Sequence, residues 1–232
     1  MSEICFKDKR RRVHFLHVGK TGGSAVKSVL DGFRETPEYS LVLHGHKISL
    51  RDVPNGELVV FFLRDPISRF VSGFYSRQRK GEPRYSIKWR PIEKEVFQRF
   101  STPNEIAVSL ADERSSGHAL AVRAMESVNH FKSYSKWYID FDYFRSRTDD
   151  ILFIGFKESL DADFIQLKRI FKIHQDIHLP TDDITAHRNP TNLNKYIDEQ
   201  GIAALREWYS EDYRFISLCK EILSSRANSC DP

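Results

Sequence analysis

A short segment near the N-terminus has the residue types of a phosphate-binding loop. Residues 16–24 read L-H-V-G-K-T-G-G-S and follow an apolar stretch that begins at Val13. Apolar residues then recur at helical spacing from Val26 to Phe33, which predicts a strand, a tight turn and a helix. Glycines let the backbone aim its N–H groups inward, and a helix N-terminus adds further donors. We expect an anion to bind here, held by Gly19, Lys20, Thr21, Gly22, Gly23 and Ser24.

The most common phosphate loop of this kind does not fit the register. A Walker A loop needs a glycine five residues before the glycine of G-K-T, and His14 occupies that position. The chain also has no apolar strand that ends in a lone aspartate for magnesium. The loop therefore favours a phosphate site without a metal, and a P-loop-like kinase or nucleotide-binding protein is the alternative.

A second phosphate site is predicted after a buried strand. Residues 58–63 form a continuous apolar run, typical of a strand buried on both faces of a parallel sheet. Arg64 ends this run, and the following Asp-Pro pair suits the start of a helix. Arg69 and Ser72 lie three positions apart on one face of that helix. Two arginines and a serine hydroxyl suit a phosphate. The alternative is a surface ion pair between Arg64 and Asp65, with a solvated Arg69.

Together the two motifs resemble the sulfotransferases that use 3′-phosphoadenosine 5′-phosphosulfate (PAPS). H-V-G-K-T-G-G-S resembles their 5′-phosphosulfate loop, and L-R-D-P-I-S-R-F-V-S-G-F-Y resembles their 3′-phosphate motif. Between them, residues 44–46 read H-G-H, as in the uronyl 2-O-sulfotransferases of heparan and dermatan sulfate. The resemblance is closest to that branch and its bacterial relatives. It weakens over residues 80–150 and returns at 151–160, 188–189 and 208–213.

The resemblance implies a sulfotransferase that moves a sulfuryl group from PAPS to an acceptor hydroxyl without a metal and releases adenosine 3′,5′-bisphosphate. It implies that Lys20 neutralises the leaving 5′-phosphate. Arg64 and Ser72 would bind the 3′-phosphate, with Arg69 in support. Arg188, in a late loop, would close over the nucleotide.

The acceptor hydroxyl needs a general base whose pKa is near the working pH, which is the usual role of histidine. His46 is the first candidate, because the resembled branch uses the second histidine of its H-G-H. His44 would orient the substrate or share the role, and His17 or His187 are alternatives. Glu158 follows a predicted strand, where it supports the site or caps a helix.

Composition predicts one globular domain. The chain has 232 residues, of which 40% are hydrophobic and 12% aromatic, and a net charge of +4. This mild charge does not indicate a nucleic-acid partner, and no apolar run has the length of an integral membrane segment. We expect a basic leader at 1–12 and a single sulfotransferase-like domain at 13–232. Three cysteines without a zinc spacing indicate reduced thiols. These features predict a cytoplasmic, bacterial-type enzyme, or alternatively a Golgi lumenal domain without its anchor.

The apolar pattern predicts an α/β fold with a P-loop-like parallel sheet and helices on both faces. Strands are expected at 13–18, 40–43, 58–63 and 151–156. A helix follows the last strand, residues 174–194 form a long loop, and a pair of helices ends the chain.

The acceptor is open among a glycan, a glycolipid and a small alcohol, with a carbohydrate or glycoconjugate favoured. A non-catalytic protein that binds adenosine bisphosphate or a polyanion is a further alternative. The sequence does not predict the oligomeric state.

Overall fold

The computed structural model describes residues 10–182, 184–185, 189–190 and 192–228. Within them, four parallel strands form one sheet in the order β2-β1-β3-β4. The strands are β1 (Arg11–Leu16), β2 (Tyr39–Leu43), β3 (Leu58–Leu63) and β4 (Ile151–Phe156).

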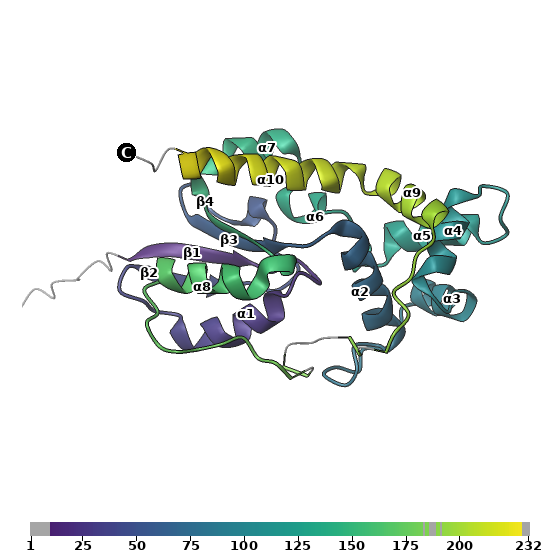
Figure 1. Ribbon diagram of the computed structural model, residues 1–232, viewed down its shortest axis with the longest axis horizontal. Coiled ribbons are helices and arrows are strands. Elements are labelled where there is room, and N and C mark those ends of the chain that lie inside the picture. The colour runs from purple at the N-terminus through teal and green to yellow at the C-terminus, as the bar shows by residue number, and fades with distance from the viewer. Residues whose placement is uncertain (1–9, 183, 186–188, 191, 229–232) are drawn as a thin grey trace, which may run out of the picture.

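Helices connect and follow the strands (Figure 1). The α-helices of the described residues are α1 (Gly23–Leu30), α2 (Pro66–Gln78), α3 (Pro91–Arg99), α4 (Pro103–Ala111), α5 (His118–Ser127), α6 (Ser135–Tyr138), α7 (Phe141–Ser146), α8 (Leu160–Ile170), α9 (Glu199–Trp208) and α10 (Ser210–Asn228). Short 3-10 helices lie at Asp31–Phe33, Leu50–Asp52, Thr148–Asp150 and Lys157–Ser159.

The sheet is covered on both faces, as the apolar pattern predicts. Every residue of β3 is buried, and successive side chains point to opposite faces. Val60 and Phe62 pack into a core shared with α1 and α8. Val59 and Phe61 pack into a second core shared with α6, α7 and α10. Figure 1 shows these helices on the two sides of the sheet.

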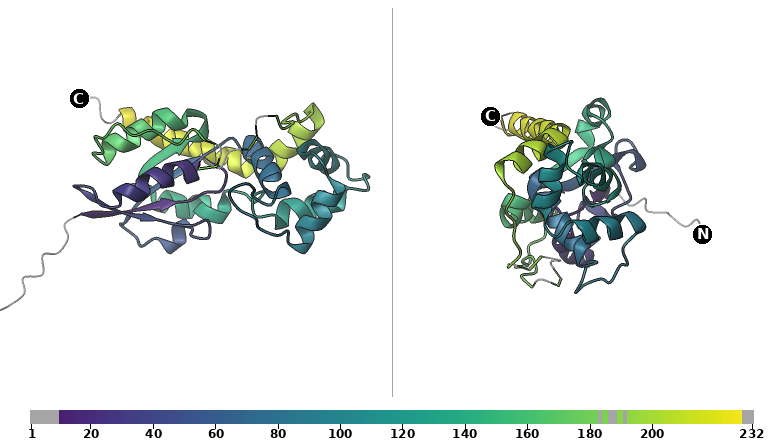
Figure 2. Two further views of the ribbon diagram at one scale, coloured as in Figure 1. Left: turned by 90° about the horizontal axis from the view of Figure 1, so that it is seen from below. Right: turned by 90° about the vertical axis from the view of Figure 1, so that its right-hand side faces the viewer.

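A third hydrophobic cluster lies beyond the carboxyl ends of the strands. It joins α2, α3, α4, α5 and α9 around buried residues such as Phe70, Phe100 and Leu205. Figures 1 and 2 show these helices gathered at one end of the molecule. The phosphate-binding loop after β1 and the start of α2 therefore lie between the sheet and this helical group.

The predicted strands at 58–63 and 151–156 are confirmed, and the one at 40–43 begins one residue earlier. The predicted strand at 13–18 lies at 11–16, because Arg11 and Arg12 pair with β2 through their backbones while their side chains stay exposed. The last two residues of the predicted leader thus belong to the sheet. The described residues of 174–194 form no helix or strand, and the C-terminal helix pair is confirmed.

The start of α2 has the predicted cap. The Asp65 carboxylate accepts a hydrogen bond from the backbone N–H of Ser68 at 2.7 Å, and Pro66 occupies the first helical position. This cap fixes where the second phosphate motif leaves β3. None of the helices in the described residues is both long and apolar enough to cross a membrane.

Candidate active site

The segment after β1 forms a tight loop that leads into α1. Lys20 and Gly22 both have left-handed backbone conformations, with φ of 69° and 89°. Position 22 favours glycine for two reasons. Its backbone is left-handed, and a Cβ there would lie 2.9 Å from the Leu160 side chain of α8. The loop therefore depends on close packing between the start of α1 and α8.

The loop offers backbone N–H groups to an anion. Among the described residues, the N–H groups from Gly19 to Ser24 donate to no backbone carbonyl, whereas that of Ala25 bonds to the Gly22 carbonyl at 3.0 Å. Such donors at a helix N-terminus suit a phosphate or sulfate group. The half-buried Ser24 lies in the first turn of α1. Thr21 is different: its buried hydroxyl donates to the Val18 carbonyl at 2.9 Å and so stabilises the loop itself.

Lys20 lies half-buried among other cations. Burial and the nearby guanidinium groups of Arg79 and Arg64 lower the pKa of Lys20 to about 7. Positive charges that repel one another are stabilised when an anion binds between them. The electrostatics of the loop thus favour an anionic ligand.

Arg64, in the predicted 3′-phosphate motif, contacts the Lys20 loop. It follows β3, and its Nη1 donates a hydrogen bond to the Lys20 carbonyl at 3.4 Å. Burial lowers the pKa of Arg64, an effect that Glu158 opposes. Ser72 is half-buried on α2, and its carbonyl accepts a hydrogen bond from Nδ2 of Asn189 at 3.1 Å. The late loop therefore contacts α2 beside the predicted 3′-phosphate residues.

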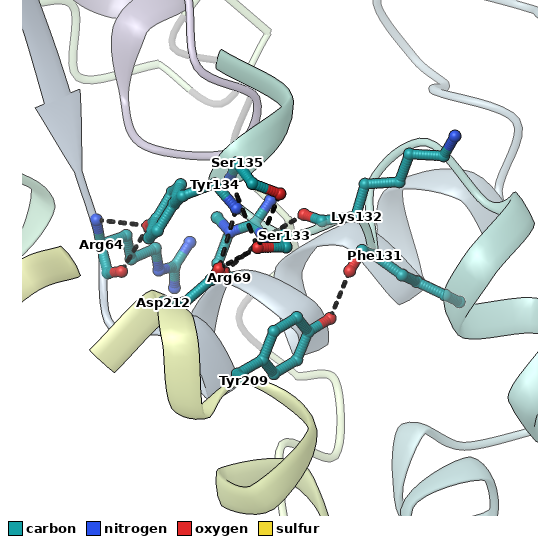
Figure 3. Close-up of polar contacts among 9 residues, drawn as sticks. All are labelled: Arg64, Arg69, Phe131, Lys132, Ser133, Tyr134, Ser135, Tyr209 and Asp212. Carbon is teal, nitrogen blue, oxygen red and sulfur yellow. Dashed lines mark hydrogen bonds and ion pairs between the residues drawn. The ribbon is translucent and has the colours of Figure 1, made fainter. Parts of the chain in front are cut away.

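Arg69 does not occupy the position expected of a direct phosphate ligand. It is completely buried, and its Nη2 lies 3.4 Å from the Asp212 carboxylate and also donates to the Lys132 carbonyl. Its guanidinium carbon lies 4.6 Å from the centroid of the Tyr134 ring (Figure 3). An amphipathic pattern cannot distinguish an arginine that faces a ligand from one that is paired inside the protein. We therefore leave Arg69 out of the phosphate-binding set.

His46 lies beside the phosphate-binding loop. Its Nδ1 is 3.0 Å from the His17 carbonyl, and the two imidazole rings have centroids 3.9 Å apart. A Cβ placed on Gly19 would lie 3.9 Å from this Nδ1 and equally close to the Trp137 ring. Because a carbonyl only accepts hydrogen bonds, Nδ1 is the protonated nitrogen and Nε2 has the free lone pair.

The surroundings of His46 keep its ring neutral. Although the residue is exposed, neighbouring atoms displace part of its water, and this desolvation lowers the pKa of His46 below 6.5. The positive charges of Lys27, Lys136 and Lys20 lower it further, against the effect of the His17 carbonyl. A neutral imidazole with a free Nε2 can accept a proton at neutral pH.

His44 belongs to a chain of polar contacts that runs along the sheet. Its Nε2 lies 2.7 Å from Nδ1 of His14, and Nε2 of His14 contacts the Glu57 carboxylate. One nitrogen of the His14 ring therefore contacts Glu57 and the other contacts His44, so the three side chains form a continuous chain of contacts. His14 is buried, and its link to Glu57 was not predicted from the sequence.

Sequence reasoning missed a run of residues between α5 and the end of α6. His130 packs against α2, where a Cβ on Gly73 would lie 2.9 Å from its own Cβ. Burial and the charges of Lys20 and His46 lower the pKa of His130 well below 6.5. Trp137 donates from Nε1 to the His46 carbonyl at 3.2 Å. The sequence signal that could have pointed to this segment is its high content of aromatic and basic residues. Residues 129–138 read N-H-F-K-S-Y-S-K-W-Y.

The structure thus gathers most of the predicted residues at the carboxyl end of the sheet. Direct contacts join the Lys20 loop to Arg64, and His46 packs against Gly19. Glu158 accepts a hydrogen bond from the Asp65 backbone at 3.0 Å and so supports the start of α2. Two predicted residues, Arg188 and His187, lie outside the described part of the chain.

In the described residues, no group of three or more His, Cys, Asp or Glu side chains is arranged to hold a metal ion.

The chain was also compared with known proteins. A comparison with curated proteins finds no match. A family model described as the sulfotransferase family matches residues 3–216, which is most of the 232-residue chain. The chain therefore belongs to the sulfotransferase family and is a sulfotransferase.

Proposed function

We propose that this sulfotransferase takes the sulfuryl group from PAPS and transfers it to a hydroxyl of a carbohydrate or glycoconjugate. The contact between Arg64 and the Lys20 carbonyl is the main support for this donor. It brings two cationic motifs together, one for each phosphate of an adenosine 3′,5′-bisphosphate product. The N–H groups of the Lys20 loop, which donate to no backbone carbonyl of the described residues, fit the phosphosulfate end of the donor.

In the proposed reaction, some residues act on the leaving phosphate and another acts on the acceptor hydroxyl. Donor binding supplies a sulfuryl group on a 5′-phosphate leaving group. Lys20 and the loop N–H groups stabilise the negative charge that grows on that phosphate as its bond to sulfur breaks. His46 accepts the acceptor's hydroxyl proton at Nε2 while the hydroxyl oxygen bonds to sulfur. Arg64 and Ser72 hold the 3′-phosphate and so fix the donor for this transfer.

The charges around His46 favour an acceptor that is itself anionic. Lys27, Lys136 and Lys20 all lower the pKa of His46, so the proposed base lies in a positive field. A uronyl sugar or a sulfated glycan would be attracted to such a field, whereas a neutral alcohol would gain nothing from it. This supports the resemblance of the H-G-H segment to that of the uronyl 2-O-sulfotransferases.

Calorimetry tests the donor. Adenosine 3′,5′-bisphosphate should bind at least about tenfold more tightly than adenosine 5′-phosphate, because one charge-assisted contact contributes about 1.5–3 kcal/mol. Arg64→Ala should remove most of this preference, while Arg99→Ala, at an exposed position of α3, should keep it. Equal affinities in the wild type, or a magnesium requirement, would instead support a kinase-like nucleotide-binding protein.

Transfer of radiolabelled sulfate from PAPS tests the acceptor. We expect incorporation into uronyl oligosaccharides, with less into matched neutral oligosaccharides and none into phenols or simple alcohols. A preference for neutral acceptors would contradict the anionic assignment. Nucleotide binding without transfer to any acceptor would favour a non-catalytic binding protein.

A further inference from the structure

Residues 130–137, the bridging segment, touch the three motifs of the site. His130 packs on α2 against Gly73, the residue after Ser72, and Tyr134 contacts the backbone of Arg64. Trp137 bonds to the His46 carbonyl and lies against the phosphate-binding loop. One short stretch of chain therefore links the proposed 3′-phosphate site with the proposed base.

The bridging segment is anchored on the C-terminal helices (Figure 3). The Asp212 carboxylate of α10 accepts hydrogen bonds from the Tyr134 N–H at 2.9 Å and from the Ser133 hydroxyl. The Tyr209 hydroxyl donates to the Phe131 carbonyl at 2.6 Å. Asp212 and Tyr209 are 0% and 1% exposed, so water does not compete for these bonds.

Arg69 compensates the charge of this anchor. Its only ion pair in the described residues is with Asp212, and both side chains are almost completely buried. Its Nε and Nη1 have no hydrogen-bond partner there, but aromatic rings of Tyr134, Tyr209 and Trp137 surround the guanidinium within 6 Å or less. The arginine that sequence analysis assigned to phosphate thus holds the bridging segment to α2 and α10.

The Tyr134 hydroxyl forms hydrogen bonds with both backbone groups of Arg64. It accepts a hydrogen bond from the Arg64 N–H at 3.0 Å and donates one to the Arg64 carbonyl at 2.5 Å. Complete burial raises the pKa of Tyr134, so the phenol keeps its proton and its ability to donate. This buried hydroxyl therefore helps to hold the Arg64 backbone at the end of β3.

We propose that the bridging segment positions two residues of the site and that its effects on nucleotide binding and on catalysis can be separated by mutation. Tyr134 sets the discrimination for a 3′-phosphate by holding Arg64, and Trp137 sets the rate of transfer by holding the His46 backbone. This inference rests on the proposed function, because it takes Arg64 as the 3′-phosphate ligand and His46 as the base. Neither Tyr134 nor Trp137 contacts substrate in this scheme.

The test is the ratio of affinities for adenosine 3′,5′-bisphosphate and adenosine 5′-phosphate, measured by calorimetry in each variant. Tyr134→Phe should lower this ratio about tenfold, with the loss confined to the bisphosphate. Trp137→Phe should keep the ratio and lower kcat. Tyr209→Phe is the matched control. It removes another buried tyrosine hydroxyl that bonds to the bridging segment, at Phe131, without touching Arg64, so it should lower Tm and keep the ratio.

The outcomes separate this inference from the function on which it rests. A wild type that shows no preference for the bisphosphate defeats the proposed function itself. A wild type with the preference, combined with an unchanged ratio in Tyr134→Phe or an equal fall in Tyr209→Phe, overturns the positioning role. If Tyr134→Phe does not fold, Trp137→Phe decides: a lowered ratio or an unchanged kcat would contradict the separation of the two effects.

Discussion

The guanidinium of Arg64 donates a hydrogen bond to the backbone carbonyl of Lys20, 44 positions away in the chain, at 3.4 Å. This contact joins the end of β3 to the loop after β1, which are neighbouring strands of the sheet. Lys20 has a left-handed backbone conformation, and its carbonyl accepts this hydrogen bond. The conformation of one phosphate motif thus depends on a side chain of the other.

Replacing Lys20 by alanine should impair catalysis more than binding. The charge it neutralises grows as the leaving group departs, so kcat should fall about 10²–10³-fold, as for the loss of one preorganised transition-state contact. Affinity for adenosine 3′,5′-bisphosphate should fall by less. Steady-state kinetics and calorimetry give the two quantities separately.

Lys94→Ala on α3 is the matched control, because Lys94 is exposed and lies in the separate helical cluster. It should leave kcat unchanged. Normal turnover in Lys20→Ala would mean that the loop is structural or binds another ligand.

Nucleotide affinity should depend on pH through Lys20. Burial, Arg79 and Arg64 lower the pKa of Lys20 to about 7 in the free protein, and a bound phosphate raises it again. Above pH 7 binding therefore takes up a proton, and the affinity for adenosine 3′,5′-bisphosphate should fall by up to about tenfold per pH unit. Calorimetry between about pH 7 and pH 9 measures this slope, since phosphate is fully ionised throughout that range.

Lys20→Ala should flatten the slope, because the group that takes up the proton is gone. Proton uptake is also visible directly as a dependence of binding enthalpy on the ionisation enthalpy of the buffer. An affinity that is independent of pH in the wild type would contradict the lowered pKa.

The sheet and the motifs that end its strands could be predicted because they depend on local pattern. The apolar run at 58–63 and the Asp-Pro pair after it determine β3, the cap and α2 with little help from the rest of the chain. The turn of the loop around Lys20 was likewise predicted from local pattern, because Gly22 has the left-handed backbone conformation that favours glycine. Here local sequence and tertiary structure agree.

The partners of the predicted residues could not be read from the sequence, because they come from distant positions. Arg69 and Asp212 are 143 positions apart, and nothing in either local pattern indicates a buried ion pair. Tyr134 and Trp137 likewise lie in a region where no motif is recognisable. The spacing of Arg69 from Ser72 indicated a shared helix face, but it carried no sign that the guanidinium pairs with Asp212 inside the protein.

The chain of contacts from Glu57 through His14 should support catalysis only through His44. Glu57→Gln leaves His14 without its carboxylate partner and weakens the contacts that orient His44. We expect the transfer rate to fall about fivefold, equivalent to about 1 kcal/mol. In a His44→Ala background the same substitution should have almost no effect, which a double-mutant cycle measures.

Glu35→Gln is the control for loss of a surface carboxylate, since Glu35 pairs with Arg10 at 2.9 Å near the same edge of the sheet. It should not change the rate in either background. Additive effects of Glu57→Gln and His44→Ala would show that the chain of contacts only stabilises the fold.

His46 should be essential for transfer and dispensable for nucleotide binding. If it accepts the acceptor proton, His46→Ala should abolish transfer and leave the affinity for adenosine 3′,5′-bisphosphate almost unchanged. The wild-type rate should also fall as pH drops through the histidine pKa, which desolvation and nearby cations place below 6.5, because only the neutral ring accepts a proton. A profile of kcat from about pH 5 to pH 8 at saturating PAPS should therefore be level near neutrality and decline on the acid side.

His118 gives a matched control for this last prediction. Its Nδ1 lies 3.0 Å from the Ser109 carbonyl, the same contact that Nδ1 of His46 makes with His17, but in the helical cluster away from the phosphate-binding loop. His118→Ala should lower stability and leave the acid side of the rate profile where it was. Residual transfer in His46→Ala with an unchanged acid decline would assign the base to another group, with His44 and His130 next in position. Loss of nucleotide affinity in His46→Ala would instead show that the ring supports the phosphate-binding loop, because it packs beside Gly19.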